Sequence, residues 1–362
     1  MRRAIQSCTL LLVACVAMAA RAEPPAAAPS GGGDRPVALV IHGGAGVIER
    51  SALSTKEEAA VRADLDRALD AGQAVLAGGG TALDAVEAAI LVLEDSPRFN
   101  AGKGAVFDAE GGHQLDASVM EGHTGRAGAV AGVTTVRHPV SLARAVMEHS
   151  PHVMLAGAGA ERFADTRPGI ERVPNTWFDT DRRREQLEAA REAVAADAGS
   201  DDVVPPQQYF GTVGAVALDG HGHIAAATST GGMTNKRWNR IGDSPVIGAG
   251  TWADARCGVS GTGWGEFYIR AAVAHDICAR VAYRGDTLAA AAEAVVNGVV
   301  PAMGGDGGAI ALDAQGNIAM PFNTEGMYRG WIGSDGVPHV AIYADDMLRG
   351  DAASRRKPSP GS

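Results

Sequence analysis

GTVGAVAL, residues 211–218, joins a polar linker to a run that is typical of a buried strand. Upstream, residues 197–210 read DAGSDDVVPPQQYF and show no hydrophobic period, whereas VGAVAL is short and apolar. Thr212 is either an ordinary strand residue or, if the chain is cut before it, a new N-terminus. A threonine at an N-terminus carries both a hydroxyl nucleophile and a base, its α-amine, whose pKa is about 8. We predict that the chain cleaves itself between Gly211 and Thr212 and then hydrolyses amides with Thr212.

The composition is that of a globular protein with a substantial core. Of the 362 residues, 46% are hydrophobic and 20% charged, which is enough for one large domain or two small ones. The 48 glycines gather in short loops between apolar runs, as expected where backbone turns sharply or approaches a ligand. The net charge of −10 at pH 7 would repel phosphate backbones, so nucleic acid is not an expected partner.

Residues 1–22 have the pattern of a signal peptide. A positively charged start, MRR, precedes an apolar run over residues 10–20 and a small-x-small cleavage site, ARA, at residues 20–22. The run is too short to span a bilayer, so no membrane span is expected. We expect a bacterial-style export signal, a periplasmic or secreted protein, and a Pro/Ala/Gly-rich tether over residues 23–36. Lipoprotein anchoring at Cys15 is the less favoured alternative.

Two cysteines, Cys257 and Cys278, follow the signal segment. An oxidising compartment allows a disulfide between them, but two cysteines alone do not establish a disulfide framework. We favour the simpler interpretation that both are small core residues.

Hydrophobic periodicity predicts strands and helices in separate blocks. Before Thr212 the predicted strands are 37–41, 104–107, 113–119 and 128–136, and the predicted helices are 56–76, 81–93, 141–148, 153–163 and 182–196. Thr81 and Asp84 form a cap signature for the second helix. After Thr212, two similar hairpins over 217–225 and 311–319 flank helices over 266–281 and 287–299. This order favours sheets stacked between helical layers over alternating βαβ units.

Amide hydrolysis explains the polar clusters that accompany Thr212. Thr230, at the far end of the first hairpin, can face Thr212 across paired strands and orient its hydroxyl or amine. Amides within SGTGWG, residues 260–265, can stabilise the oxyanion, although Thr262 in this run could also be an ordinary loop residue with no catalytic role. Arg240 and Asp243 would bind the carboxylate and ammonium of an α-amino acid. Taken alone, that pair is more simply interpreted as a surface salt bridge.

The sequence lacks the motifs of nucleotide-binding and metal-dependent enzymes. The sequence contains no G-x-x-x-x-G-K-[ST], H-E-x-x-H or C-x-x-C pattern, and residues 261–265 miss the dinucleotide-binding register. His221 and His223 are interpreted as turn residues, and a metal-dependent enzyme is therefore disfavoured.

Several stretches resemble the plant-type asparaginases, also called isoaspartyl peptidases, among the N-terminal-nucleophile hydrolases. They are HGGAG (42–46), FNAG (99–102), GTVG (211–214), STGGMTNK (229–236), RIGDSP (240–245), GAG (248–250) and PFNTEGMYRG (321–330). Each is weak alone, but their order and spacing are specific, and together they span residues 37 to about 343.

The resemblance implies an α+β fold, a four-layer αββα sandwich, made as a precursor that cleaves itself. The α chain would comprise residues 37–211, with its linker over about 165–211, and the β chain residues 212–362. The resemblance also implies a dimer of αβ units, a small-molecule or dipeptide substrate and no required cofactor.

Roles for individual residues follow from the same resemblance. Thr212, Thr230 and Asn100 match catalytic positions of the family. The substrate-binding positions match Arg240, Ile241, Gly242, Asp243, Thr262, Gly263, Trp264 and Gly265, with the oxyanion site at Thr262 and Gly263. A structural sodium ion would be held by backbone carbonyls in the loop that contains Leu93, Glu94, Ser96, Phe99, Ala101 and Lys103.

Two residues depart from the family pattern. Asn239 stands where Gly is common, and asparagine tolerates the left-handed conformation that Gly allows. Trp264 stands where a small residue is common, so its ring would narrow the pocket or stack on a β-aspartyl peptide. The substrate preference, and not the chemistry, therefore stays open.

We predict a hydrolase of β-aspartyl (isoaspartyl) dipeptides and of the side-chain amide of L-asparagine, which releases L-aspartate. Both substrates present a β-amide beside a free α-amino, α-carboxyl group. A glycosylasparaginase, whose pocket accepts a sugar on the amide nitrogen, is the alternative within the same chemistry. A non-catalytic periplasmic protein that binds amino acids or peptides is the alternative from another class, but it gives no reason for Thr230 to face Thr212.

Overall fold

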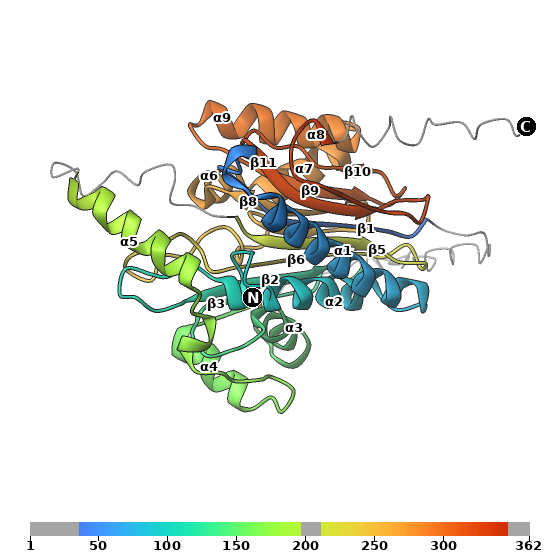
Figure 1. The fold of residues 1–362 in the computed structure, drawn as a ribbon. Coiled ribbons are helices and arrows are strands. Elements are labelled where there is room, and N and C mark those ends of the chain that lie inside the picture. Colours follow the sequence, from blue (N-terminus) through green and yellow to red (C-terminus); the bar gives the residue numbers. More distant parts are fainter. Residues whose placement is uncertain (1–35, 197–210, 347–362) are drawn as a thin grey trace, which may run out of the picture. The chain divides into compact units, whose positions relative to one another are not determined.

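An eight-stranded and a four-stranded β-sheet form the centre of the structure, and helices pack on both of them (Figure 1). The computed structural model describes residues 36–196 and 211–346, which belong to one compact unit. The predicted signal segment, the tether up to residue 35, the linker residues 197–210 and the residues from 347 onward lie outside the described ranges. The described part of the chain is thus a mixed α/β structure.

The larger sheet carries the predicted nucleophile at its centre. Its strand order is β12-β11-β1-β5-β6-β2-β3-β4. β5 and β6 form the first predicted hairpin and pair antiparallel, with Val213 opposite Ser229. The start of β5 therefore lies beside the end of β6. The strands are β1 (Ala38–Gly46), β2 (Leu115–Glu121), β3 (Ala127–Val133), β4 (Met154–Ala156), β5 (Val213–Leu218), β6 (Ile224–Thr230), β11 (Gly326–Ile332) and β12 (Pro338–Ala341).

The smaller sheet faces the larger one. Its order is β10-β9-β8-β7, with β7 (Thr251–Ala253), β8 (Cys257–Gly263), β9 (Gly307–Asp313) and β10 (Ile318–Ala319), and β9 and β10 form the second predicted hairpin. β8 and β9 contact β5, and β1 contacts β9. Buried apolar side chains fill the space between the sheets, among them Val40, Val216, Ile310 and Leu312. This packing brings β8 close to the start of β5.

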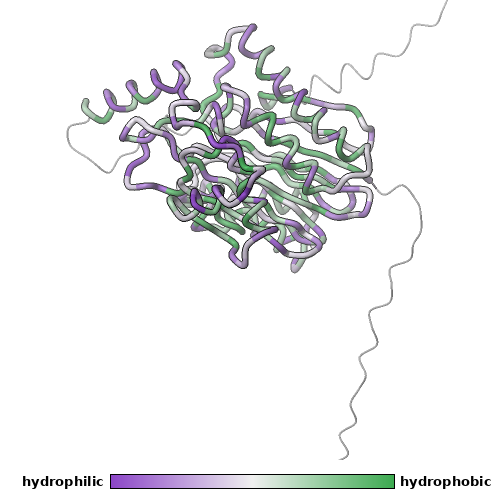
Figure 2. The backbone as a smooth tube through the Cα atoms, turned by 90° about the horizontal axis from the view of Figure 1, so that it is seen from below, coloured by the Kyte–Doolittle hydropathy of each residue, from purple (hydrophilic) through white to green (hydrophobic). Residues whose placement is uncertain are grey.

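Helices pack on both sheets. α1 (Thr55–Ala77), α2 (Ala82–Asp95) and α3 (Pro139–His149) pack on the larger sheet, and α7 (Val273–Ala279) and α8 (Leu288–Ala294) pack on the smaller one. Each of these two interfaces has its own cluster of buried apolar residues. Figure 2 shows hydrophobic residues along the strands and hydrophilic residues in many of the connecting loops. The remaining helices are α4 (Gly157–Asp165), α5 (Asp181–Ala196), α6 (Gly265–Ala271) and α9 (Val300–Ala302).

The first two helices begin where local sequence signals predict. The Thr81 side chain accepts a hydrogen bond from the Asp84 backbone, which caps α2 as expected. At α1, Ser54 and Glu57 form a reciprocal capping box. The predicted helices over 56–76, 81–93, 141–148 and 182–196 are confirmed to within two or three residues.

Two predictions in the first half of the chain are wrong. The predicted strand over 37–41 is too short, because β1 continues through the HGGAG run to Gly46, with a shift of pairing against β11 between His42 and Gly44. The predicted strand over 104–107 is absent from the described structure, where Gly102–Gly104 forms a 3₁₀ turn instead. Gly102 has φ +47°, and a Cβ on Gly104 would lie 2.1 Å from the Phe99 carbonyl oxygen, so this turn requires glycine at both positions.

Three predicted helices are interrupted or shortened. The helix over 153–163 begins only at Gly157, because Met154–Ala156 pairs with β3 as the edge strand β4. The helix over 266–281 breaks at Ala272, whose φ of +47° lies in the left-handed region and separates α6 from α7. Over 287–299, the α-helical pattern gives way to a π-helical segment at Val295–Val299. Sequence periodicity does not register such local changes.

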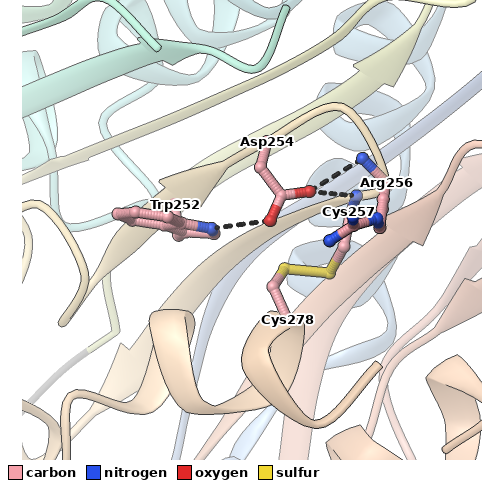
Figure 3. Close-up of a disulfide and its surroundings, with 5 residues drawn as sticks. All are labelled: Trp252, Asp254, Arg256, Cys257 and Cys278. Carbon is pink, nitrogen blue, oxygen red and sulfur yellow. Dashed lines mark hydrogen bonds between the residues drawn. A yellow bond between two sulfur atoms is a disulfide. The ribbon is translucent and has the colours of Figure 1, made fainter. Parts of the chain in front are cut away.

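The two cysteines form a disulfide, which corrects the interpretation as unpaired core residues (Figure 3). Cys257 on β8 and Cys278 on α7 have Cα atoms 5.5 Å apart and are separated by 21 residues. Both are buried, as expected, but the sequence alone does not place α7 against β8. Beside the bond, Asp254 accepts hydrogen bonds from the backbone amides of Arg256 and Cys257 and closes the turn into β8. The loop that the disulfide closes contains residues 262–265 of the predicted oxyanion site.

Reduction of this disulfide is expected to lower the free energy of unfolding by about 3 kcal/mol, because the unfolded chain regains the entropy of an open loop of this size. Urea unfolding of the protein with and without dithiothreitol measures the difference. The double variant Cys257→Ala/Cys278→Ala serves as the control and should unfold identically in both conditions. Equal midpoints for the unmodified protein would show that the bond contributes nothing.

Candidate active site

Thr212 lies at the entrance of β5 with its side chain against Thr230. The Thr212 hydroxyl donates to Thr230 Oγ1 over 3.0 Å, and both residues are buried. Thr230 Oγ1 also accepts from the Gly232 amide at 3.0 Å. The antiparallel pairing of β5 and β6 produces this contact, because Val213 pairs with Ser229 and the same register sets the preceding Thr212 beside Thr230. The predicted facing of the two hydroxyls is thus present in the structure.

The bond before Thr212 lies against the glycine-rich part of β1. A Cβ on Gly211 would lie 2.3 Å from Gly44 Cα, and a Cβ on Gly44 would lie 2.4 Å from Gly211 Cα. Gly44 also has φ +112°, which side-chain-bearing residues rarely adopt. The two backbones can therefore touch only because both positions are glycine. The close contact holds the Gly211–Thr212 peptide in a defined place.

Thr262 on β8 is the second hydroxyl at the nucleophile. Its Oγ1 accepts from the Thr212 backbone amide at 3.2 Å and from the Ala45 amide at 3.1 Å. Gly263 follows with φ +151°, and a Cβ there would lie 2.4 Å from the Asp306 carbonyl oxygen. The two sheets thus meet at Thr212, because Thr212 directly precedes β5 of the larger sheet and its nitrogen donates to Thr262 on β8 of the smaller sheet.

Asn100 supports the turn that follows Thr230. Its side-chain amide donates to the Gly232 carbonyl at 2.7 Å, and its side-chain oxygen accepts from the Val106 amide at 3.0 Å. The Gly231 amide in turn donates to the Asn100 backbone carbonyl at 3.2 Å. The structure therefore places Asn100 one turn away from Thr230, at the same end of the sheet as Thr212.

Asp243 is a buried carboxylate with an unsatisfied oxygen. It is 4% exposed, and its Oδ2 has no hydrogen-bond partner among the described residues. Burial raises the pKa of Asp243 to about 7, although the Arg240 charge acts in the opposite direction. A surface ion pair would leave this carboxylate in water, so the simpler interpretation of Arg240 and Asp243 does not describe the structure. A cation placed at Oδ2 would favour the ionised form.

Arg240 binds Glu266, a residue that the sequence did not single out. Its Nε and Nη2 donate to the two Glu266 carboxylate oxygens at 2.8 Å each. The Trp264 indole donates to the same carboxylate, and its ring packs edge-on against Phe267 with centroids 5.1 Å apart. Glu266 lies in the first turn of α6, where an acidic residue is common for helix stability alone. Because this position explains an acidic residue by itself, the sequence did not indicate that Glu266 contacts Arg240.

Gly265 lies beside both predicted substrate-binding side chains, Arg240 and Asp243. A Cβ on Gly265 would lie 2.8 Å from both Arg240 Nη2 and Asp243 Oδ1. Gly242 packs under the same guanidinium, with its Cβ position 2.8 Å from Nη1, whereas Ile241 is 40% exposed and points to solvent. The run Arg240–Asp243 and the run Thr262–Gly265 therefore form one wall that ends at Thr212. Asn239, at φ +55°, adopts the left-handed conformation anticipated for it.

A buried chain of polar side chains connects the two sheets under this wall. Burial lowers the pKa of His42 to about 3, so the ring is neutral, and its Nε2 lies 2.9 Å from Ser260 Oγ. Ser260 and Thr262 are two residues apart on β8, so both point toward the larger sheet. The sequence marked His42 only as part of a glycine-rich run. The chain continues from Ser260 through Thr228 (2.7 Å), Thr251 (2.5 Å) and Ser118 (2.8 Å) to the Ser244 carbonyl (2.6 Å).

The loop predicted to hold sodium is lined by backbone. The Glu94 carbonyl oxygen lies against Gly102 and the Phe99 carbonyl oxygen against Gly104. The Ser96 amide donates to the Leu93 carbonyl and the Gly104 amide to the Ala101 carbonyl, which leaves each carbonyl a second lone pair. Lys103 turns its ammonium to the carbonyls of Trp177 and Asp179. Oxygen donors of this kind fit a hard cation.

In residues 36–196 and 211–346, no three His, Cys, Asp or Glu side chains converge as a metal site requires. No helix in those ranges is long and apolar enough to cross a membrane.

Comparison with known proteins gives the family. The family described as Asparaginase matches residues 35–342. The chain belongs to the asparaginase family. It is 52% identical over 309 residues to a protein named isoaspartyl peptidase from Escherichia coli (strain K12), covering 85% of this chain and 96% of that protein. The Arabidopsis thaliana protein named probable isoaspartyl peptidase/L-asparaginase 2 is 42% identical over 325 residues, covering 84% and 98%.

The resemblance read from the sequence is therefore confirmed, and with it the assignment to an enzyme of the asparaginase family. The match also reaches animal proteins, since the Homo sapiens isoaspartyl peptidase/L-asparaginase is 38% identical over 313 residues, covering 86% of this chain and 97% of that protein. Every polar residue of the site described above lies inside the matched range.

Proposed function

We propose that this asparaginase-family chain is an autoprocessing threonine hydrolase that cleaves β-aspartyl dipeptides and the side-chain amide of L-asparagine and releases L-aspartate. The observation that carries the proposal is the environment of Thr212, whose hydroxyl lies 3.0 Å from Thr230 Oγ1 and whose amide lies 3.2 Å from Thr262 Oγ1. The names of the relatives support the substrate class, since they are called isoaspartyl peptidase or isoaspartyl peptidase/L-asparaginase.

Self-cleavage begins at the Gly211 carbonyl. The Thr212 hydroxyl oxygen attacks the Gly211 carbonyl carbon, the C–N bond breaks, and the proton lost by the hydroxyl ends on the Thr212 nitrogen. The resulting ester is hydrolysed by water, which leaves a carboxylate on Gly211 and a free α-amine on Thr212. Contact with Gly44 supports this step because it fixes the peptide beside its own nucleophile. The products are the α chain, 37–211 after loss of the leader and tether, and the β chain, 212–362.

Turnover uses the same hydroxyl on a bound substrate. Arg240 binds the substrate α-carboxylate and Asp243 its ammonium, which satisfies the buried Oδ2 and draws Asp243 to its ionised form. The Thr212 hydroxyl attacks the β-carbonyl, its amine accepts the proton, and the leaving nitrogen receives that proton as the C–N bond breaks. Water then hydrolyses the aspartyl ester. The Thr262 hydroxyl and the Gly263 amide stabilise the oxyanion, and Thr230 and Asn100 orient the nucleophile.

The remaining family expectations belong to the same proposal. The contacts of the two sheets with each other and with the outer helices support a four-layer αββα sandwich. The backbone carbonyls of the 93–103 loop that keep a free lone pair support a structural sodium ion, which would supply only local order. A disulfide is typical of an oxidising compartment and supports export to the periplasm or beyond. The proposal also includes a dimer of αβ units and a mature chain without residues 1–22.

A comparison of three substrates tests the proposed activity. Release of aspartate from L-asparagine and from β-aspartyl-leucine is expected, with little or no turnover of an asparagine that carries N-acetylglucosamine on its amide nitrogen. Efficient cleavage of the glycosylated substrate would instead indicate a glycosylasparaginase. Binding of all three without any released aspartate would indicate a non-catalytic binding protein and would contradict the proposal.

A further inference from the structure

A second pocket opens beside the predicted cleavage site. Its wall includes Gly44, Asn100 and Gly211, and it extends to Arg98, Arg182 and Tyr328. None of Arg240, Asp243 or Thr262 lines it. The pocket is therefore distinct from the amino-acid site, but Gly211, the residue directly before Thr212, lines it.

Thr212 separates the two sites. On one side its amide contacts Thr262 of β8, and the wall of β8 leads through Gly265 to Arg240 and Asp243. On the other side Gly211 packs on Gly44 of β1, and the pocket lies along that part of β1. A substrate whose aspartyl end lies at Asp243 and whose β-carbonyl lies at Thr212 extends its other end toward this second pocket.

The pocket is rich in positive charge. Three arginines line it, Arg98, Arg182 and Arg183, against one acidic residue, Glu49. Asp64 binds Arg98 at 2.9 Å, and Arg183 donates to the Gly104 carbonyl at 2.7 Å, so both are held by the protein. Arg182 donates to the hydroxyl of Tyr328, a neutral acceptor. Arg98 is paired with a carboxylate and Arg183 is buried, whereas Arg182 is exposed and the Glu57 carboxylate acts on it through its charge alone, so Arg182 is the guanidinium of the three that a ligand can reach.

The same pocket has an apolar side. Ile48 and Leu53 belong to its wall, and both pack against the large hydrophobic cluster under the sheet. An arginine next to aliphatic side chains suits an amino acid that has a free carboxylate and an apolar side chain. Ammonia, the leaving group of asparagine, has neither feature.

We propose that this pocket is the subsite for the departing amino acid of a β-aspartyl dipeptide, with Arg182 as the ligand of its α-carboxylate. The inference rests on the proposed function and adds a specificity to it. Arg182 lies in the first turn of α5, which precedes the cleavage site, so the α chain supplies this subsite and the β chain supplies the nucleophile. The carboxylate that self-cleavage leaves on Gly211 has the same chemistry and lies at the same wall, so it is the competing occupant.

Three substrates and two variants test the subsite. Unmodified enzyme should cleave β-aspartyl-leucine with kcat/KM about tenfold to a hundredfold higher than β-aspartyl-leucinamide, because only the acid offers a carboxylate to the guanidinium. Arg182→Gln should erase that preference through a higher KM for the acid. Arg184→Gln removes a neighbouring charge that pairs with Asp179 at 2.6 Å, and this control should keep the preference.

Hydrolysis of L-asparagine distinguishes a failure of the proposed subsite from a failure of the proposed function. If asparagine is hydrolysed but the unmodified enzyme treats acid and amide equally, the subsite is absent or the Gly211 carboxylate occupies it, and the inference is overturned. It is likewise overturned if Arg182→Gln keeps the full preference. If neither asparagine nor the dipeptides are hydrolysed, the proposed function itself has failed.

Discussion

Thr212→Ala is expected to accumulate as one uncut chain with no measurable hydrolase activity. The substitution removes the only atom that attacks in both reactions, the Thr212 hydroxyl oxygen, so neither the ester at Gly211 nor the aspartyl ester can form. Loss of a covalent nucleophile lowers turnover by at least about 10⁴-fold in comparable hydrolases. Denaturing gels and intact mass report the cleavage, and release of ammonia from L-asparagine reports the activity.

Thr212→Ser is the matched control for this variant. Serine keeps a hydroxyl at the same position and lacks only the methyl group, so it should still cleave and turn over, more slowly. A folded Thr212→Ala protein that is processed into two chains, or that releases ammonia, would show that another residue attacks. Thermal unfolding of the uncut variant verifies that loss of activity is not loss of fold.

Arg240→Ala is expected to lower kcat/KM for L-asparagine by about a hundredfold, mainly through KM. The substrate α-carboxylate loses a charged hydrogen-bond partner, which is worth about 1.5–3 kcal/mol. The Glu266 carboxylate, now without its guanidinium, adds a negative charge close to the incoming carboxylate. Steady-state kinetics on the processed protein give KM and kcat separately.

Arg237→Ala is the control for the anchor. Arg237 lies three residues earlier on the same loop, outside the wall formed by residues 240–243 and 262–265. Its removal changes the net charge by the same amount and should leave KM nearly unchanged. An unaltered KM in Arg240→Ala, or an equal rise in both variants, would remove Arg240 from carboxylate binding.

Local sequence signals predicted the central pairing of the site. The apolar run after Thr212 and the Asp/Gly turn at 219–222 require a hairpin, and a hairpin of that length brings Thr230 back to Thr212. The caps of α1 and α2 and the second hairpin follow from equally local rules. These features depend on residues that are close together in the chain.

Contacts between distant segments were beyond such rules. Glu266 beside Arg240, Ser260 beside His42, and Cys278 beside Cys257 all depend on how β8 and its following helices pack on the larger sheet. Nothing within a few residues of any of them signals that contact. The predicted strand over 37–41 stopped short of Gly46 for a related reason, because glycines that admit a neighbouring backbone cannot be told by composition from glycines in a loop.

N-terminal sequencing of the purified, unmodified protein tests the central claim most directly. Self-cleavage between Gly211 and Thr212 predicts a fragment that begins Thr-Val-Gly-Ala-Val, in equal amount to the fragment that precedes it. A fully active preparation in which no fragment starts at Thr212 would contradict the account, because the proposed nucleophile and base would then not exist as a free N-terminus.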